Sequence, residues 1–300
     1  MKYSRLENFG RHSLSTLEMN TKGDQMEKGV VYVATGVTCI CEAIKSAKSL
    51  KRHNPHLPTA IFTNMTFVDP IFDFHYLIEN PEFSTLDKMK NLWKTPFHNT
   101  IFLDSDTYVL SDLTHVFDIL NRVDFAGTHE VARGFWYNEL QNEVPDAFCE
   151  LNGGMLVFKA LPEVINLLKD WHDAYLKTTK WLPNHGSSKW MLTNDQPSLR
   201  YLLYHCHGIK LWVLPTEYNA LRNNGTYLWG SAKIVHGRQN IEAVAEKMNR
   251  FTNVERTFFQ GFGVVADFGR VSTGHVIETC LRINYLAFRE IFHRLLSKFR

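Results

Sequence analysis

Two aspartates follow directly on an apolar stretch of the chain. The run Ile101-Phe102-Leu103 is typical of a buried strand, and Asp104, Ser105 and Asp106 follow it without a break. Because residues i and i+2 of an extended chain point to the same side, Asp104 and Asp106 can converge on one point while Ser105 faces away. Two buried carboxylates repel each other, and a divalent cation is the natural compensation. The pattern therefore predicts a metal-binding pair beyond the end of a strand, where open α/β sheets bind ligands.

Two other interpretations of this acid pair stay open at this point. The acids could cap a helix that starts near Asp112, or lie solvated in a turn. The string also resembles the opening motif of haloacid dehalogenase-like phosphatases, which would make Asp104 the nucleophile and Asp106 the acid/base, with Thr107 completing the motif. That family places the motif on its first strand and needs a later acid pair for magnesium. Here about a hundred residues precede the motif, and no such pair follows.

The elements that must position these acids alternate between strands and helices. Val30–Thr35 and Thr59–Thr63 are β-branched, apolar runs that predict buried strands. Between them Thr38 is a suitable N-cap for a helix that Asn54-Pro55 stops. Strand, helix and strand in this order predict a parallel sheet with a right-handed crossover. The fold class expected is α/β, with a mostly parallel central sheet flanked by helices.

The later segments continue the alternation. A helix capped by Ser84 precedes the apolar strand of the acid pair, and a short helix starts at about Asp112. The remaining expected elements are strands at 124–129, 151–159, 209–214 and 233–237 and helices at 161–177 and 195–204.

The composition of the chain limits the classes of function that it can have. The chain has 300 residues, a net charge of +2, 44% hydrophobic and 13% aromatic residues, which is typical of a folded globular protein. The near-neutral balance argues against nucleic acid as a ligand. Five cysteines without zinc-knuckle spacing favour reduced thiols and a cytoplasmic location. The first twenty residues contain no apolar signal region, and no uncharged apolar run reaches the roughly 18 residues of a membrane span.

The two ends of the chain differ from its body. Residues 1–28 are polar, without periodicity, and are expected to be poorly ordered. Residues 277–300 are basic and predict an amphipathic helix, with the apolar positions Leu281, Tyr285, Phe288, Phe292 and Leu295/Leu296. Such a helix either lies on an anionic membrane, as a peripheral contact, or docks on the core of the protein. The expected organisation is a catalytic domain over 29–260 and an extension over 261–300.

Six short motifs occur in the order of one known family: VYVATG, the helix of Lys88, LDSDT, LNGGMLVF, NDQ and KIVHG. Over residues 30–240 the chain resembles GT-A glycosyltransferases, which are Rossmann-like nucleotide-diphospho-sugar transferases. Within them it is similar to family eight, the glycogenin and bacterial galactosyltransferase branch. The resemblance implies transfer of a hexosyl group from a nucleotide-sugar, expected to be UDP-linked, to a glycan, lipid-linked or protein acceptor.

The resemblance also implies roles for individual residues. The metal ligands would be Asp104, Asp106 and His236, holding Mn²⁺ or, as the alternative, Mg²⁺; an imidazole in the set suits Mn²⁺ better. The catalytic residues would be Asn152, Asp195 and Gln196. The donor would be bound by Ala34, Thr35, Lys88, Asp104, Ser105, Asp106, Asn152, Gly153, Gly154, Asp195 and Arg238. Viewed alone, Lys88 could equally be a solvated helix lysine, and His236 a hydrogen-bonded strand-end histidine.

The chain also departs from the family pattern. The glycogenin branch continues its histidine motif as H-F-x-G and then Lys-Pro-Trp, whereas this chain reads His236-Gly237-Arg238. Arg238 is expected to replace the missing diphosphate-binding lysine, since guanidinium binds phosphate well. Asn219 and Arg222 are further candidates for the acceptor or phosphate side. A retaining reaction needs no strong protein base, whereas an inverting one needs a carboxylate, for which Asp195 and Glu130 are the candidates.

Two further classes of function stay open. A non-catalytic protein that binds sugars or nucleotide-sugars could use the same scaffold, and release of nucleotide in the presence of an acceptor would exclude it. A sugar-nucleotide pyrophosphorylase is disfavoured, because no Gly-rich phosphate loop follows the first predicted strand.

Overall fold

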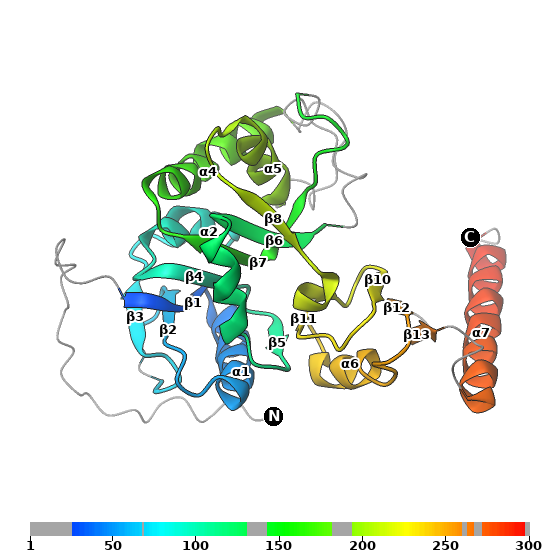
Figure 1. Cartoon of the computed structure of the whole chain (residues 1–300). Coiled ribbons are helices and arrows are strands. Elements are labelled where there is room, and N and C mark those ends of the chain that lie inside the picture. Colours follow the sequence, from blue (N-terminus) through cyan, green and yellow to red (C-terminus); the bar gives the residue numbers. More distant parts are fainter. Residues whose placement is uncertain are drawn as a thin grey trace.

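The computed structural model describes residues 26–67, 69–130, 143–181, 194–259, 263–266 and 272–297. Its centre is a seven-stranded sheet with the order β3-β2-β1-β4-β7-β6-β8 (Figure 1). These strands are β1 (Met26–Ala34), β2 (Thr59–Thr63), β3 (Phe74–Leu77), β4 (Phe97–Leu103), β6 (Phe125–His129), β7 (Leu151–Lys159) and β8 (Leu211–Leu214). Only β7 runs antiparallel to its two neighbours. The predicted α/β class with a mostly parallel sheet is confirmed.

The first strand begins earlier than predicted. Met26 and Lys28 pair with Phe97 and Asn99 of β4, so β1 extends by three residues into the segment expected to be poorly ordered. These residues are exposed, and backbone pairing with the neighbouring strand, rather than burial, makes them a strand. Residues 1–25 lie outside the described residues.

The start of the first helix also differs from the prediction. Helix α1 (Val37–His53) is preceded by Gly36 and not capped by Thr38. Gly36 has φ of +80°, which favours glycine, and its backbone N–H donates to Asn64 Oδ1 at 2.8 Å. At the other end Asn54 terminates the helix as predicted.

Two short helical segments flank the acid pair in the sequence. Helix α2 (Thr85–Asn91) has the predicted Ser84 N-cap, whose hydroxyl accepts from the Leu86 N–H at 3.2 Å. It continues as a 3₁₀ turn, η1 (Leu92–Lys94). The helix expected near Asp112 is a 3₁₀ helix, η2 (Thr114–Asn121). The Asp112 carboxylate accepts from the Thr114 N–H at 2.8 Å, so this acid starts η2 rather than belonging to it.

Alternating residues of the strands build two cores, one on each face of the sheet. Val30 and Ile101 pack with α1 and η2, whereas Val31 and Phe102 pack with α2, α4 (Pro162–Trp181) and α5 (Gln196–His205). This alternation is the period of two that a strand buried on both faces requires. Helices therefore cover both faces of the sheet, as Figure 1 shows.

A smaller lobe follows β8 and carries the third core cluster. Its elements are η6 (Thr216–Asn219), β9 (Ala220–Leu221), β10 (Thr226–Leu228), β11 (Ile234–His236), α6 (Ile241–Met248), β12 (Arg256–Phe259) and β13 (Gly263–Ala266). The lobe joins the main body because β11 pairs with β5 (Thr107–Val109), directly after the acid pair. Strands β12 and β13 are paired antiparallel, so the domain boundary predicted at residue 260 divides a hairpin.

The last helix, α7 (Thr273–Ser297), extends away from the small lobe (Figure 1). It begins four residues before the predicted start. His275 and Thr279 are buried, whereas Leu281 is 66% and Phe288 70% exposed. The described side chains of α7 from Leu281 to Phe292 are therefore largely exposed and do not dock on the core. None of the described helices combines the length and apolarity that crossing a membrane demands. All five cysteines are unpaired.

Candidate active site

Asp104, Asp106 and His236 form a compact cluster beyond the end of β4. Their candidate ligand atoms all lie within 4.8 Å of one another. The His236 Nε2 is 3.3 Å from Asp106 Oδ1 and 3.8 Å from Asp104 Oδ2. Ser105 turns toward α1, where its hydroxyl donates to Glu42 at 3.5 Å. The two acids thus converge with Ser105 facing away, as the i, i+2 spacing predicts.

The pairing of β5 with β11 brings the histidine to the acids. Thr107, next to Asp106, is opposite His236 in the register, and the Gly237 N–H donates to the Asp106 carbonyl at 3.0 Å. The ring then lies against Gly154 of β7, where a Cβ would come within 2.1 Å of the His236 Cε1. Only glycine leaves room for the imidazole there. Gly154 thus shapes the metal-ligand cluster, in addition to its predicted place beside the donor.

The cluster is strongly coupled electrostatically. Burial by itself would raise the pKa of Asp106, but the charge and hydrogen bond of His236, with the charge of Arg238, lower it to about 2. Burial likewise would lower the pKa of His236, and the two carboxylates raise it instead. Burial raises the pKa of Asp104, despite the opposing charges of Lys88 and His236. In this arrangement a cation, either a protonated imidazole or a metal ion, compensates the negative charge of the two carboxylates.

One ring nitrogen of His236 makes no hydrogen bond to any described residue. Its Nδ1 is buried and has no hydrogen-bond partner among the described residues, while its Nε2 faces the carboxylates. The set offers two carboxylates and one imidazole, which is chemistry that a divalent transition metal accepts. The residues present therefore fit a divalent metal ion.

Lys88 is a buried member of the site and not a solvated helix lysine. It is 6% exposed, and its Nζ lies 2.5 Å from Asp195 Oδ2 and 3.4 Å from Asp104 Oδ1. It also donates to the Gly153 carbonyl at 3.1 Å. Burial would lower the pKa of Lys88, but the charges of Asp104 and Asp195 raise it, so the amine stays protonated. Lys88 therefore links the metal cluster to the start of α5.

An amide and carboxylate network adjoins Lys88 at the start of β7. The Asn152 side chain donates to Glu130 at 2.6 Å and accepts from Asn219 at 2.7 Å. Gln196 donates to the same Glu130 at 3.1 Å and accepts from the Gly153 N–H at 3.2 Å. These side chains come from the end of β6, from β7, from η6 and from the start of α5, and they present amide and carboxylate groups side by side. Such groups can hydrogen-bond sugar hydroxyls.

The first strand ends at the same edge of the sheet. Ala34 is buried, and the Thr35 hydroxyl donates to Asp87 Oδ2 at 2.6 Å. The other Asp87 oxygen accepts from the Glu82 N–H at 2.8 Å. The hydroxyl assigned to nucleotide contact is therefore already bonded within the protein. Contact of Ala34 and Thr35 with the nucleotide stays a prediction.

Arg238 lies at the open side of the cluster. Its Nε is 3.5 Å from Glu42 and 3.7 Å from Asp106, and its side chain is 58% exposed. The neighbouring Arg222 donates to the Arg238 carbonyl at 2.6 Å. A guanidinium that is accessible and adjacent to the acids is well placed to meet an anionic ligand.

Sequence reasoning missed or undervalued several members of this site. No motif in the sequence points to Glu42 or Asp87, and Glu130 is a candidate there only as the base of an inverting reaction. Glu130 lies at the end of β6, after the run Asp124–His129, and that position at a strand end is the signal that could have identified it. Glu42 lies on a helix recognised by its apolar face, and Asp87 is explained in the sequence as an acid in the first turn of its helix.

Comparisons with known proteins agree with this geometry. Residues 98–251 match the family model of nucleotide-diphospho-sugar transferases. A search of curated proteins returned no match. Among solved structures the chain is similar to an active-site mutant of LgtC, at 14% identity and a TM-score of 0.50, covering 73% of this chain and 93% of that one. Mouse xyloside xylosyltransferase 1 aligns at 13% identity and a TM-score of 0.45, over 72% of this chain and 99% of that one.

The glycosyltransferase GlyE of Streptococcus pneumoniae aligns at 16% identity and a TM-score of 0.45, over 71% of this chain and 56% of that one. The family match includes the acid pair, the β7 glycines, the start of α5 and His236. The phosphatase interpretation of the acid pair is therefore wrong, because residues 98–251, which contain the motif, match the family of nucleotide-diphospho-sugar transferases.

Proposed function

The chain belongs to the family of nucleotide-diphospho-sugar transferases, and from this premise we propose that it transfers a hexosyl group from a UDP-linked sugar. The acceptor class is a glycan, a lipid-linked sugar or a protein. One observation carries the proposal: the metal-ligand cluster of Asp104, Asp106 and His236 lies next to Lys88 and to a network of sugar-binding side-chain types.

The metal site would stabilise the leaving group of the reaction. A Mn²⁺ ion held by Asp104, Asp106 and His236 would act as a Lewis acid on the departing diphosphate. Arg238 would bind the diphosphate from the open side, replacing the lysine that the glycogenin branch carries. At an effective dielectric of 20, one charge pair at 4 Å contributes roughly 4 kcal/mol, so charge compensation at this end can supply a large part of the acceleration.

The remaining residues would hold the donor. Lys88 holds the carboxylates of Asp104 and Asp195 in place through two ion pairs. Asn152, Asp195 and Gln196 would bind and orient the sugar hydroxyls. Gly153 leaves the backbone accessible next to Lys88, where a Cβ would come within 3.0 Å of the amine.

We propose a retaining outcome, because neither of the two candidate bases, Asp195 and Glu130, is free to act as a base. Asp195 is ion-paired with Lys88, and Glu130 is bonded by two amides. In a retaining reaction a diphosphate oxygen can take the acceptor proton on the same face of the sugar, and no strong protein base is required. Nuclear magnetic resonance of the anomeric proton in the first product tests this; an inverted configuration would refute it.

Release of UDP from a UDP-sugar, with Mn²⁺ and an acceptor present, tests the transferase proposal. We expect the wild-type protein to release UDP and Asp106→Asn to release none while keeping its unfolding transition. A wild-type protein that binds UDP-sugars but never releases UDP with any acceptor would support the non-catalytic alternative.

We also propose a peripheral membrane contact for α7, in a cytoplasmic protein. Its exposed apolar side chains recur at three- and four-residue spacing: Ile277, Leu281, Tyr285, Phe288, Ile291 and Phe292. Basic residues flank this stripe, a combination that favours anionic bilayers. Flotation with anionic liposomes should recover the full chain and lose a variant that lacks residues 277–300. Equal recovery of both proteins would contradict the contact.

A further inference from the structure

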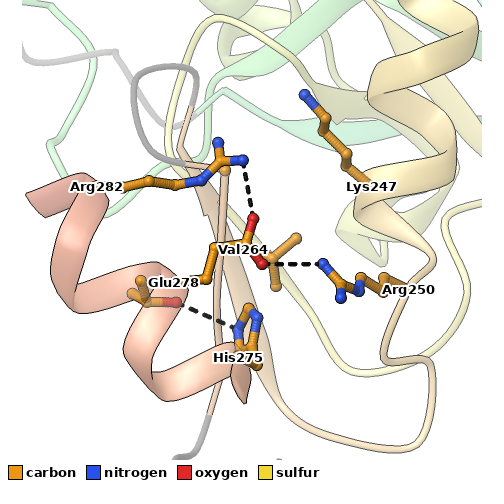
Figure 2. A pocket seen from close by; sticks show the side chains of 8 residues that line it. Lys247, Arg250, Val264, His275, Glu278 and Arg282 are labelled. Carbon is orange, nitrogen blue, oxygen red and sulfur yellow. Dashed lines mark hydrogen bonds and ion pairs between the residues drawn. The ribbon is translucent and has the colours of Figure 1, made fainter.

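A small cavity of about 50 Å³ lies where α6, β13 and the start of α7 meet (Figure 2). None of the candidate active-site residues lines it. A water molecule occupies roughly 30 Å³ in the liquid, so the cavity accommodates the end of a small group rather than a sugar. Its lining residues are Lys247, Arg250, Gly263, Val264, His275, Glu278, Thr279 and Arg282.

Positive charge exceeds negative charge around this cavity. Glu278 accepts from Arg282 at 2.9 Å and from Arg250 at 3.3 Å, so one carboxylate is shared between two guanidinium groups. Lys247 reaches toward the same opening from α6 (Figure 2) and makes no ion pair with any described residue. With His275 neutral, the positive charges of Lys247, Arg250 and Arg282 face the single negative charge of Glu278. Two positive charges are therefore left for a ligand.

His275 adds a polar atom that the fold does not use. Its side chain is buried beside Phe251, with the two rings 4.5 Å apart, and its Nδ1 has no partner within the described part of the chain. Burial and the charge of Arg250 lower the pKa of His275, so the ring is neutral and can donate one N–H. A buried donor without a partner costs free energy, and an oxyanion in the cavity would satisfy it.

The cavity is continuous with the apolar stripe of α7. Ile277 and Leu281 of the stripe alternate in the sequence with Glu278 and Arg282 of the cavity. In a helix of 3.6 residues per turn, Arg282 lies at the edge of the stripe. A bilayer that received the stripe would thus bring its headgroups to the mouth of the cavity.

We infer that this cavity binds the phosphate group of an anionic phospholipid headgroup, through Lys247, Arg250, Arg282 and His275. The inference rests on the proposed membrane contact of α7 and adds a specific site to it. Phosphate is the chemistry that several cations and a neutral N–H donor recognise together. The site would hold α7, and with it the small lobe, at a fixed place on the membrane surface.

Flotation of the full chain with vesicles of phosphatidylcholine and phosphatidylglycerol tests the inference. A second set, made equally negative with oleate, contains less lipid phosphate at the same surface charge. We expect tighter binding to the phosphatidylglycerol vesicles, and about fivefold weaker binding by Lys247→Ala, the effect of one cation near an anionic surface. Lys48→Ala, a matched exposed lysine on α1, should behave as the wild type.

Glu278→Gln separates ligand binding from a structural role. If the cavity binds phosphate, removing the competing carboxylate frees two guanidiniums and tightens binding to phosphatidylglycerol vesicles. If Glu278 only fastens α7, the same change loosens the helix and weakens binding. Weaker binding by Glu278→Gln, or equal binding by Lys247→Ala and Lys48→Ala, would overturn the inference.

Inorganic phosphate and the wild-type protein distinguish the remaining outcomes. Lys247-dependent binding of inorganic phosphate without any preference for phosphatidylglycerol would assign the site to a soluble phosphate and overturn the lipid assignment. A wild-type protein that fails to float would overturn both the membrane contact and this site. UDP binding by the wild type, measured separately, tests the transferase proposal whatever the vesicles show.

Discussion

Gly154→Ala is the substitution that most directly tests whether His236 belongs to the metal site. The new Cβ would lie 2.1 Å from the His236 Cε1 and 2.4 Å from its Nδ1, whereas ordinary contact begins at 3.4 Å. The ring must therefore retreat by about 1.3 Å. Its Nε2 is 3.3 Å from Asp106 Oδ1, so a displacement of this size moves it out of the ligand set.

The expected loss of metal affinity from this displacement can be estimated. A misplacement of about 1 Å in a catalytic arrangement can cost about 100-fold in rate, and loss of a group that orients a metal ligand costs about 10- to 100-fold in affinity. We expect Gly154→Ala to bind Mn²⁺, in the presence of UDP, at least about tenfold more weakly than the wild type. Calorimetric titration of Mn²⁺ gives the affinity. His236→Ala, which removes the ring without a steric clash, should show the same loss.

Gly127→Ala is the matched control. Gly127 lies on β6, the strand next to β7, and a Cβ there would meet the Met155 carbonyl at 3.2 Å and a Leu151 methyl at 3.4 Å. Both variants overpack the sheet, at a cost of about 1–3 kcal/mol in stability. Only Gly154→Ala should weaken Mn²⁺ binding. A folded Gly154→Ala protein with wild-type Mn²⁺ affinity would refute the assignment of His236 as a ligand.

Three further substitutions probe the neighbouring residues. Lys88→Met leaves the buried Asp195 carboxylate without its ion-pair partner and should lower the free energy of unfolding by about 3–5 kcal/mol. Lys51→Met removes an ion pair to the exposed Asp73 and should cost less than about 1 kcal/mol. Equal losses in urea titrations would contradict the buried pair. Arg238→Ala should weaken UDP binding about tenfold or more without changing stability, whereas the exposed Arg289→Ala should leave UDP affinity unchanged. Gln196→Ala should raise the KM for the UDP-sugar but not the Kd for UDP, and an equal change in both would argue against a sugar contact.

The boundaries of the strands are predicted more accurately from the sequence than the first residues of the helices. Strands β2 and β7 begin and end at the predicted residues, because each contains a short apolar run flanked by polar residues or glycine. The predicted N-cap of α1, Thr38, lies two residues after the observed one, since the backbone of Gly36 and the side chain of Asn64 form that end of the helix. Asn64 lies beyond β2, and no local pattern connects it to Gly36.

Within the site, local geometry was predictable and long-range pairing was not. The convergence of Asp104 and Asp106 follows from the period of two along an extended chain. The approach of His236 depends on the register of β5 and β11, and the ion pair of Lys88 with Asp195 depends on the packing of α2 against α4 and α5. Neither is encoded in the spacing of nearby residues. Only the resemblance to a known family indicated that these residues lie together.

Titration of UDP into the protein, with Mn²⁺ and then with a chelator, tests the central claim most directly. If Asp104, Asp106 and His236 hold a metal ion that binds the diphosphate, the wild type will bind UDP far more tightly with Mn²⁺. Asp106→Asn will bind UDP equally weakly in both conditions. Equal affinity of the wild type for UDP with Mn²⁺ and with chelator would contradict the account.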